Sequence, residues 1–167
     1  MEEQQALSGQ LKQGYLYAVR LLTVTKRSRK ELARKLKSKG FAGEISDKIL
    51  DRLETQGILN DRALVEETVQ RAVREKRFGR RRIEFELKRK GAQEASIERA
   101  LANYPSEEER ANALALAEAQ WEKLKRVDPK KRKKRLYDFL ITRGFEFGLA
   151  REIISQLDRQ NDENSRD

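Results

Sequence analysis

The sequence predicts an all-α protein of three tandem three-helix repeats of the helix-turn-helix kind, arranged in an elongated, curved array. Apolar residues recur at spacings of three and four, which is typical of amphipathic helices rather than strands. One glycine-terminated pattern occurs three times along the chain. The 20 Leu and 16 Ala residues outnumber the 19 residues of Val, Ile and Thr combined, and this balance also favours helix.

The repeated pattern consists of two apolar residues four positions apart and a glycine four positions further on. Its three copies are Leu32, Leu36 and Gly40; Ile83, Leu87 and Gly91; and Leu136, Leu140 and Gly144. Downstream of the outer copies the apolar residues keep identical offsets from the glycine, and the middle copy is looser. The pattern therefore indicates a triplication, with repeats at 11–60, 61–105 and 106–158 and flexible tails at 1–10 and 159–167.

Each repeat has room for three short helices. In the first repeat, the apolar spacing predicts helices around 11–22, 32–36 and 45–53. The matching positions are 64–73, 83–87 and 97–104 in the second repeat, and 113–124, 136–140 and 149–157 in the third. Three thin cores need fewer apolar residues than one thick core, so the hydrophobic content of 37% does not require a disordered chain.

Residues that favour helix ends stand where these helices should begin and end. Ser with Glu three positions later, the capping-box sequence, occurs at 28–31 and at 106–109. Asp128 precedes Pro129, which places an N-cap before a proline at the first helical position. The glycines of the two outer copies are each followed by Phe, as expected for a glycine C-cap with a hydrophobic contact beyond it.

The composition excludes several classes of protein. The chain has no His and no Cys, so it lacks ligands for a zinc finger, a disulfide framework and an imidazole base. It has no glycine-rich nucleotide loop and no nucleophile with a recognisable partner, and we expect no catalytic residue, metal or cofactor. The acidic N-terminus is not a signal peptide and no apolar run is long enough to span a membrane, so we expect a cytoplasmic protein.

The net charge of +10 is concentrated in three stretches. Residues 20–40 carry a local charge of +8, residues 71–90 carry +7 and residues 123–135 carry +8, so the rest of the chain is acidic. Each stretch has the same place in its repeat. Solubility requires charge but not its segregation, and the clustering therefore favours a polyanionic or acidic partner. For any single base, a solvated helix face is the competing interpretation.

On a helical wheel, the second helix of each repeat buries its apolar pair and turns basic residues outward. Phe85 stands on this outward face, either packed against a neighbouring repeat or exposed as an anchor for a partner. Lys39, Lys90 and Arg143 directly precede the glycines, where a helix-dipole role suits them better. The candidate partner- or DNA-binding residues are Lys30, Arg34, Lys37, Arg77, Arg80, Arg81, Arg82, Phe85, Lys88, Lys130, Lys131, Arg132, Lys133, Lys134 and Arg135.

The motifs, taken in order, resemble those of the RecX family of bacterial RecA regulators. The matching segments are 57–64 (Gly-Ile-Leu-Asn-Asp-Arg-Ala-Leu) and 79–91 in the second repeat, 18–22 and 28–41 in the first, and 139–145 in the third. The resemblance covers residues 15–157. Where the family commonly has Asp-Asp, this chain has Asn60-Asp61, and where it has Phe two residues later, this chain has Ala63 followed by Leu64. The fold is expected to tolerate both changes, but any partner contact of that Phe is lost.

The resemblance implies a regulatory protein of homologous recombination, DNA repair and the SOS response. It implies that the chain lies in the helical groove of the RecA–DNA filament and modulates RecA, usually by inhibiting its ATPase, strand exchange and co-protease activity. The expected partners are the RecA filament and its single-stranded DNA, with duplex DNA left open, and the expected state is a monomer without a membrane contact.

Two alternatives remain from the residues themselves. A repeat protein of the helix-turn-helix kind could bind naked DNA directly, with no filament partner, and its affinity would then fall steeply with salt. A metal-dependent enzyme built on carboxylates would require DNA cleavage that EDTA abolishes.

Overall fold

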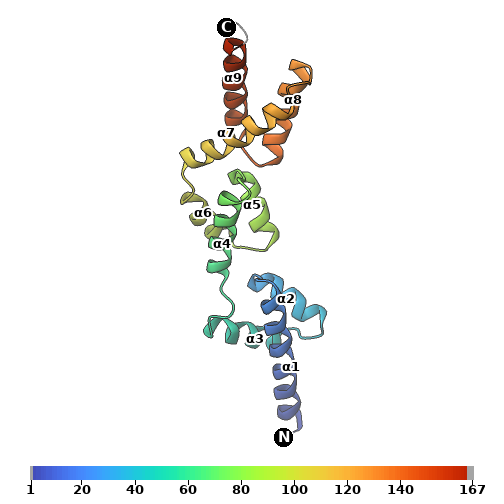
Figure 1. Cartoon of the computed structure of the whole chain (residues 1–167). Helices are drawn as coiled ribbons and strands as arrows, with labels where there is room; N and C mark the ends of the chain where they lie inside the picture. The colour runs from blue at the N-terminus through green and yellow to red at the C-terminus, as the bar shows by residue number, and fades with distance from the viewer. Residues whose placement is uncertain (1, 165–167) are drawn as a thin grey trace. The chain divides into compact units, whose positions relative to one another are not determined.

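The fold is all-α, as predicted. The computed structural model describes residues 2–164, with side chains described for residues 7–160, and over this range it contains nine helices and no strand. The helices fall three to a repeat (Figure 1). Their bounds are α1 Glu2–Val24, α2 Arg29–Ser38, α3 Glu44–Thr55, α4 Asp61–Arg74, α5 Arg80–Arg89, α6 Glu94–Ala102, α7 Ser106–Lys123, α8 Pro129–Thr142 and α9 Phe147–Asn164.

The first and last helices extend beyond the apolar patterns that predicted them. Helix α1 begins at Glu2, so residues 2–10 of the expected N-terminal tail are helical, and α9 continues to Asn164 in the expected C-terminal tail. Residues 1 and 165–167 lie outside the described residues. The expected mobility of the two ends stays a prediction.

The chain divides into two compact units that do not coincide with the repeats. Unit 1 comprises residues 1–67 and 87–97, and unit 2 comprises residues 68–86 and 98–167. The first repeat lies in unit 1 and the third in unit 2, whereas the middle repeat contributes to both. Helix α5 therefore has its N-terminal part in unit 2 and its C-terminal end in unit 1.

Within unit 1, helices α1, α2 and α3 enclose an apolar core. Ala18 from α1, Leu32 and Leu36 from α2, and Leu53 from α3 are each 0% exposed. Gly14 brings α1 close to its neighbours, because an added Cβ would lie 2.5 Å from Ile49 Cδ1. Burial of these predicted apolar positions holds the three helices together.

The core of the third repeat, in unit 2, is built in the same way from α7, α8 and α9. Leu136 and Leu140 of α8 pack with Trp121 of α7 and with Ile153 and Leu157 of α9. Trp121 is 5% exposed and Leu140 is 0% exposed. The apolar pair of the repeated pattern is thus a core pair in both outer repeats, as its spacing predicts.

The three repeated glycines end the second helices in the same way. Gly40, Gly91 and Gly144 have φ angles of 97°, 81° and 88°, the left-handed region that favours glycine. In each case the amide two residues after the C-cap donates to the carbonyl of the apolar residue five positions earlier, as Phe41 does to Leu36 at 2.9 Å. This is a Schellman motif, and it confirms the C-cap prediction.

The predicted N-caps are confirmed at two places and wrong at one. Ser28 forms a capping box with Glu31, and Asp128 accepts from the Lys131 amide at 3.2 Å with Pro129 as the first helical residue. At α7, however, the N-cap is Pro105 and no side chain caps the helix. The expected partner, Glu109, bonds to Arg80 instead.

Candidate partner and nucleic-acid interface

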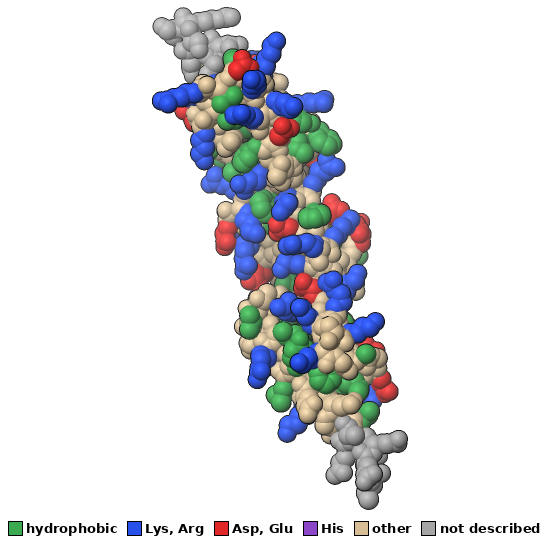
Figure 2. Space-filling view, turned by 90° about the vertical axis from the view of Figure 1, so that its right-hand side faces the viewer, with side chains coloured by type: hydrophobic (Ala, Val, Ile, Leu, Met, Phe, Trp, Pro, Cys, Tyr) green, Lys and Arg blue, Asp and Glu red, His purple; other side chains and the backbone are tan. Residues whose placement is uncertain are grey.

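Most of the candidate binding residues are exposed. Figure 2 shows Lys and Arg side chains over much of the visible face, with Asp and Glu between them. The exposed candidates are Lys30, Arg34, Lys37, Arg77, Arg81, Phe85, Lys88, Lys130, Lys131, Lys134 and Arg135. The other four, Arg80, Arg82, Arg132 and Lys133, are buried or half-buried and take part in contacts inside the fold.

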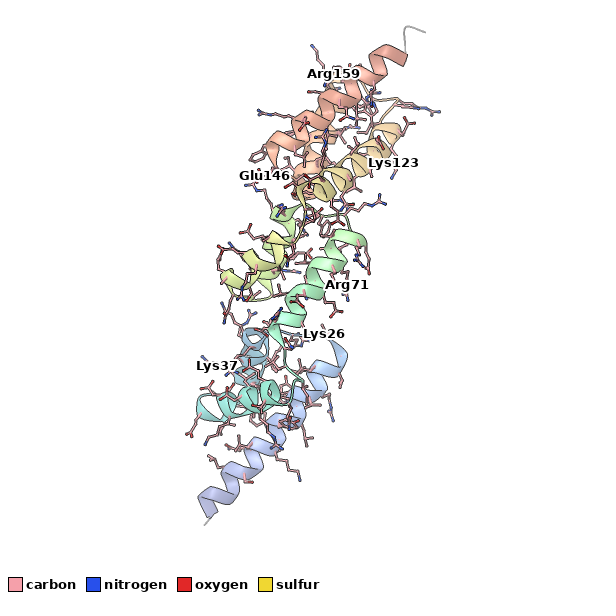
Figure 3. All side chains as sticks on the ribbon, turned by 90° about the vertical axis from the view of Figure 1, so that its left-hand side faces the viewer. Lys26, Lys37, Arg71, Lys123, Glu146 and Arg159 are labelled. Atoms are coloured by element: carbon pink, nitrogen blue, oxygen red, sulfur yellow. The ribbon has the colours of Figure 1, made fainter. Side chains whose placement is uncertain are left out.

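In unit 1, the basic face of α2 lies opposite its core pair. Lys30, Arg34 and Lys37 are spaced by four and three residues, so they share one side of the helix while Leu32 and Leu36 point into the core. Figure 3 shows Lys37 among the side chains that point outward from the ribbon. This face can reach phosphates or carboxylates with three cations about one helical turn apart.

The basic stretch of α8, in unit 2, is divided between exposed and internal side chains. Lys130, Lys131, Lys134 and Arg135 are exposed. Lys133 pairs with Asp158 of α9 at 2.5 Å. Arg132 is only 7% exposed, and its guanidinium carbon lies 3.6 Å from the centre of the Trp121 ring. The placement of Arg132 is that of a core cation–π contact, so we leave it out of the proposed interface.

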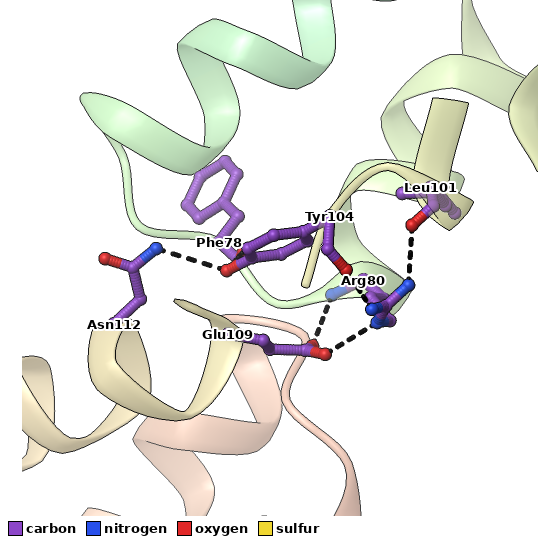
Figure 4. A network of polar contacts seen from close by, with 6 residues as sticks. All are labelled: Phe78, Arg80, Leu101, Tyr104, Glu109 and Asn112. Carbon is purple, nitrogen blue, oxygen red and sulfur yellow. Dashed lines mark hydrogen bonds and ion pairs between the residues drawn. The ribbon is translucent and has the colours of Figure 1, made fainter. Parts of the chain in front are cut away.

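Arg80 occupies a polar network at the junction of α5, α6 and α7, drawn in Figure 4. Its backbone N–H and its Nε both donate to the Glu109 carboxylate, each at 2.8 Å. The guanidinium also donates to the backbone carbonyls of Leu101 and Tyr104. Because the backbone amide and all three guanidinium nitrogens of Arg80 donate to groups inside unit 2, we leave Arg80 out of the proposed interface as well.

Tyr104 completes that network. Its hydroxyl donates to the Phe78 carbonyl at 3.3 Å and accepts from the Asn112 amide at 3.2 Å, and the residue as a whole is 2% exposed. Burial raises the pKa of the Tyr104 phenol above 10.0, the hydrogen bond from Asn112 acts in the opposite direction, and the charge of Glu109 adds to the increase. The network thus contains a neutral phenol at physiological pH.

The remaining basic residues of the middle repeat have mixed surroundings. Arg82 pairs with Glu86 at 3.5 Å, and Lys88 pairs with Glu94 at 2.9 Å. Arg77 is exposed and has a φ of 50°, which is unusual for a residue other than glycine. Arg81 is exposed and stacks on Phe147, with its guanidinium carbon 4.8 Å from the ring centre.

The first residue of the middle helix in each of the first two repeats is hydrogen-bonded to the repeat that follows, a contact that the sequence did not reveal. We call this contact a joint. In unit 1, the Arg29 amide at the start of α2 donates to Asp61, the first residue of the next repeat, at 2.7 Å. In unit 2, the Arg80 amide at the start of α5 donates in the same way to Glu109 of the repeat that follows. A carboxylate therefore caps each helix from outside, where the helix dipole favours negative charge.

A second hydrogen bond completes each joint. The Ser28 hydroxyl donates to the carbonyl of Lys90 in unit 1, and the Gly79 amide donates to the carbonyl of Arg143 at 3.0 Å in unit 2. Lys90 and Arg143 both precede the repeated glycine, so their carbonyls end the next repeat's middle helix. A Cβ on Gly79 would overlap the backbone of Gly144, so this joint has no room for a larger residue.

The side chain of Arg29 also ties α2 to α3. It donates to Glu54 at 2.5 Å and to Asp51 at 2.7 Å. Burial disfavours the charged guanidinium, but the hydrogen bonds and charges of Asp51 and Glu54 outweigh burial, and the pKa of Arg29 is raised above its ordinary value. Arg29 therefore stabilises unit 1 rather than offering a charge to a partner.

The third repeat has a different start to its middle helix. Measured back from the repeated glycine, α8 is one turn longer than α2 and α5, with 14 residues against 10 in each. Its N-cap, Asp128, comes from its own chain segment, and Pro129 has no amide N–H to donate. The amide donor of the first helical residue, which Arg29 and Arg80 use in their joints, is thus absent at this helix start.

Phe147 is an interface candidate that the sequence analysis missed. It is 50% exposed at the start of α9 and contacts Arg81 of α5, the helix on which Phe85 is 58% exposed. The alignment of the repeats on their glycines could have revealed it. The residues at the position of Phe147 in the first and second repeats are Gly43 and Glu94, so the fold does not require an aromatic side chain there. Phe85 likewise aligns with Arg34 and Asp138.

Within the described residues, no group of three or more acidic, His or Cys side chains is placed to hold a metal ion. None of the helices in that part of the chain is long and apolar enough to cross a membrane. The fold and the surface together define an α-helical repeat protein whose middle helices present basic side chains.

The chain belongs to the RecX family of regulatory proteins, which confirms the resemblance. Family models for the first, second and third three-helix domains of RecX match residues 15–53, 60–101 and 107–154. The chain is 37% identical over 148 residues to the regulatory protein RecX of Chlorobium phaeobacteroides strain BS1, covering 89% of this chain and 95% of the relative. It is 35% identical over 141 residues to that of Chlorobium limicola, covering 84% and 87%.

The fold is also that of a solved relative. The crystal structure of RecX from Lactobacillus salivarius superposes with a TM-score of 0.80, covering 90% of this chain and 98% of that one at 24% identity. The two proteins therefore share the arrangement of three-helix repeats, and at this level of identity the similarity shows the fold alone.

Proposed function

We propose that this protein binds the RecA–DNA filament through the exposed basic faces of its middle helices and inhibits the ATPase, strand-exchange and co-protease activities of RecA. The observation that carries the proposal is the recurrence of exposed bases at matching positions of the repeats. On α2 these bases are Lys30, Arg34 and Lys37. On α5, Arg81 stands at the position of Lys30, and Lys88 at that of Lys37. A filament repeats its own sites along an axis, and a repeat protein can engage such a target at several points. On this proposal the chain acts as a monomer in the cytoplasm.

The mechanism follows from contacts at several points. Bases on successive repeats would bind acidic side chains of neighbouring RecA protomers and phosphates of the bound single strand. Such a contact resists the subunit rearrangements that accompany ATP turnover, because each rearrangement would break contacts on more than one protomer. The interface we propose omits Arg80, whose guanidinium donates to groups inside unit 2, and Arg132, which lies over the Trp121 ring.

The test uses RecA from the same organism on single-stranded DNA with ATP. The wild-type protein should lower the ATPase rate and strand exchange, and the charge reversal Lys30→Glu, Arg34→Glu, Lys37→Glu should weaken both effects. The matched control reverses three exposed bases outside the candidate set and outside the three basic stretches, Lys12, Arg151 and Arg159, with the same change in net charge. Unchanged ATPase, strand exchange and filament length at excess wild-type protein would overturn the proposal.

Binding to naked DNA is the alternative, and salt separates the two. A direct DNA binder making about 6–10 phosphate contacts loses on the order of 10³–10⁵ in affinity between 50 and 200 mM salt. A filament modulator should prefer RecA-coated DNA to naked duplex near physiological salt. Competition between these two ligands for labelled protein gives the preference directly.

A further inference from the structure

Two phenylalanine side chains of unit 2 are exposed and lie outside its hydrophobic core. Phe85 on α5 is 58% exposed and Phe147 at the start of α9 is 50% exposed. In contrast, Phe145, two residues before Phe147, is 0% exposed in the core. Aromatic area left open to water is unfavourable, and neighbouring exposed rings on one domain indicate a contact surface.

The two rings belong to one strip. The guanidinium carbon of Arg81 lies 4.8 Å from the centre of the Phe147 ring. Arg81 and Phe85 are four residues apart on α5 and therefore share one face of that helix. Arg82 lies beside them, with its guanidinium carbon 5.7 Å from the centre of the Phe85 ring. Rings and guanidinium groups thus alternate along Phe147, Arg81 and Phe85, which we call the aromatic–arginine strip.

The strip is specific to this unit and not a by-product of the repeat. At the position of Phe85 the other repeats have Arg34 and Asp138. At the position of Phe147 they have Gly43 and Glu94. Those repeats form the same glycine turn and the same core pair without an aromatic residue at either of these positions. A structural role common to the repeats therefore does not explain the two rings.

We propose that the aromatic–arginine strip is a stacking platform for the unpaired bases of single-stranded DNA. Aromatic rings and guanidinium planes both stack on bases, and every base offers a face to them, so binding is tolerant of sequence. In a duplex those faces are covered by neighbouring base pairs. The net positive charge of the surrounding stretch 71–90 attracts the backbone that carries the bases.

A protein partner could also use exposed Phe and Arg as anchors, but the strip favours the single strand. Each exposed ring is bordered by a guanidinium group, which gives phosphate and base contacts together. This inference rests on the proposed function in one respect, since it names the part of the filament's DNA that unit 2 would touch. It needs no RecA to be tested.

The experiment measures binding of full-length protein to a fluorescent oligo(dT) of about 20 nucleotides, to an abasic oligonucleotide of the same length and to a duplex. The variant is Phe85→Leu with Phe147→Leu, which keeps apolar side chains at exposed positions. The control is Leu16→Ala on α1, which removes an exposed apolar side chain of similar exposure, 58%, in unit 1. Thermal melts followed by circular dichroism establish that all three proteins are folded.

We expect the wild-type protein to bind oligo(dT) more tightly than the abasic strand. The double variant should lose about fivefold or more in affinity for oligo(dT), as expected for lost stacking, and keep its affinity for the abasic strand. Leu16→Ala should bind both strands like wild type. Equal binding of the two strands by the wild-type protein, or an equal loss on both by the double variant, would overturn the stacking role.

The filament assay separates this inference from the proposed function. If the double variant binds oligo(dT) like wild type but no longer inhibits RecA, the strip contacts protein and the stacking platform is wrong. If stacking is found while the wild-type protein has no effect on RecA, the proposed function fails and the platform stands.

Discussion

The backbone amide of Arg29 donates to the carboxylate of Asp61 at 2.7 Å, so the second helix of the first repeat is capped by the first residue of the second repeat. Capping groups usually come from the residue just before the helix. At α2, Ser28 has that place, and Asp61 supplies a second cap from 32 residues away. The middle helix, which presents Lys30 and Arg34, is therefore oriented by its neighbouring repeat as well as by its own core.

Loss of the equivalent cap in unit 2 should be more damaging than loss of Asp61. Glu109 is 6% exposed and binds both the amide and the guanidinium of Arg80, so Glu109→Ala leaves a half-buried cation without its partner. We expect a loss of about 3 kcal/mol in the free energy of unfolding. Asp61→Ala should cost about 1 kcal/mol, the usual cost of a lost cap. Urea unfolding followed by far-UV circular dichroism measures both.

Glu109→Gln is the control for that pair. It keeps an acceptor for the Arg80 amide but removes the charge, and its loss should fall between those of wild type and Glu109→Ala. A Glu109→Ala protein as stable as wild type would show that the network in Figure 4 does not stabilise unit 2.

Three glycine-to-alanine substitutions should distinguish the stability cost of a positive φ angle from the cost of a Cβ that has no room. Gly144→Ala meets both, because φ is 88° and an added Cβ would overlap Arg82, and we expect a cost of about 3 kcal/mol or more. Gly40→Ala has a φ of 97° but open space, and should cost about 1–2 kcal/mol. Gly9→Ala lies in α1 with neither problem and should stabilise the helix by about 0.5–1 kcal/mol. Thermal unfolding of the three proteins gives the order, and a Gly144→Ala protein no less stable than Gly40→Ala would contradict it.

Arg132 and Lys131 are neighbours in the sequence but should respond differently to substitution. Arg132→Gln removes a buried guanidinium from the Trp121 ring, and we expect a loss of about 2 kcal/mol in stability. Lys131→Gln changes an exposed side chain and should stay within about 0.5 kcal/mol of wild type. Chemical unfolding together with Trp121 fluorescence measures both effects. Equal stability of the two variants would show that the ring contact contributes nothing.

The stability of unit 2 should fall in alkaline solution through Tyr104. Its folded pKa is raised above 10.0, so above that pH the unfolded chain loses the phenol proton while the folded chain keeps it. The folded state then binds more protons than the unfolded state, and the free energy of unfolding decreases as pH rises from about 10 toward the folded pKa. Urea unfolding at several pH values should show a smaller decrease for Tyr104→Phe than for wild type.

Tyr17→Phe is the matched control for this pH dependence, because it removes a tyrosine from unit 1 and leaves the Tyr104 network intact. It should keep the wild-type decrease. An identical pH dependence in Tyr104→Phe would rule out the buried phenol as its source.

Features set by neighbouring residues were predictable from the sequence, and features set by distant ones were not. The glycine turns depend on a local pattern of apolar residues and a left-handed glycine, and Gly40 and Gly144 were predicted correctly. The capping box expected at 106–109 did not form, because Glu109 is bound by Arg80, 29 residues earlier. Spacing alone does not reveal such a partner.

Two candidate bases could have been recognised as internal from the helix period. Arg132 stands four residues before Leu136 and eight before Leu140, so it lies on the apolar face of α8. Arg80 stands three residues before Ile83 and seven before Leu87, on the apolar face of α5. A helical wheel predicts this burial once the helix bounds are known. The Trp121 ring and the Glu109 carboxylate that receive the two side chains come from other helices and could not be predicted in this way.

The extra first turn of α8 makes the repeats unequal as building blocks. The first two repeats start their middle helices with a donor that a following repeat can accept, whereas Pro129 offers none and Asp128 already satisfies its own helix. A third repeat placed ahead of another repeat would therefore lack the amide donor of this joint. Anyone who wished to lengthen this protein by a repeat would have to insert it before α7, or rebuild the start of α8 with a shorter helix and an arginine in place of the proline.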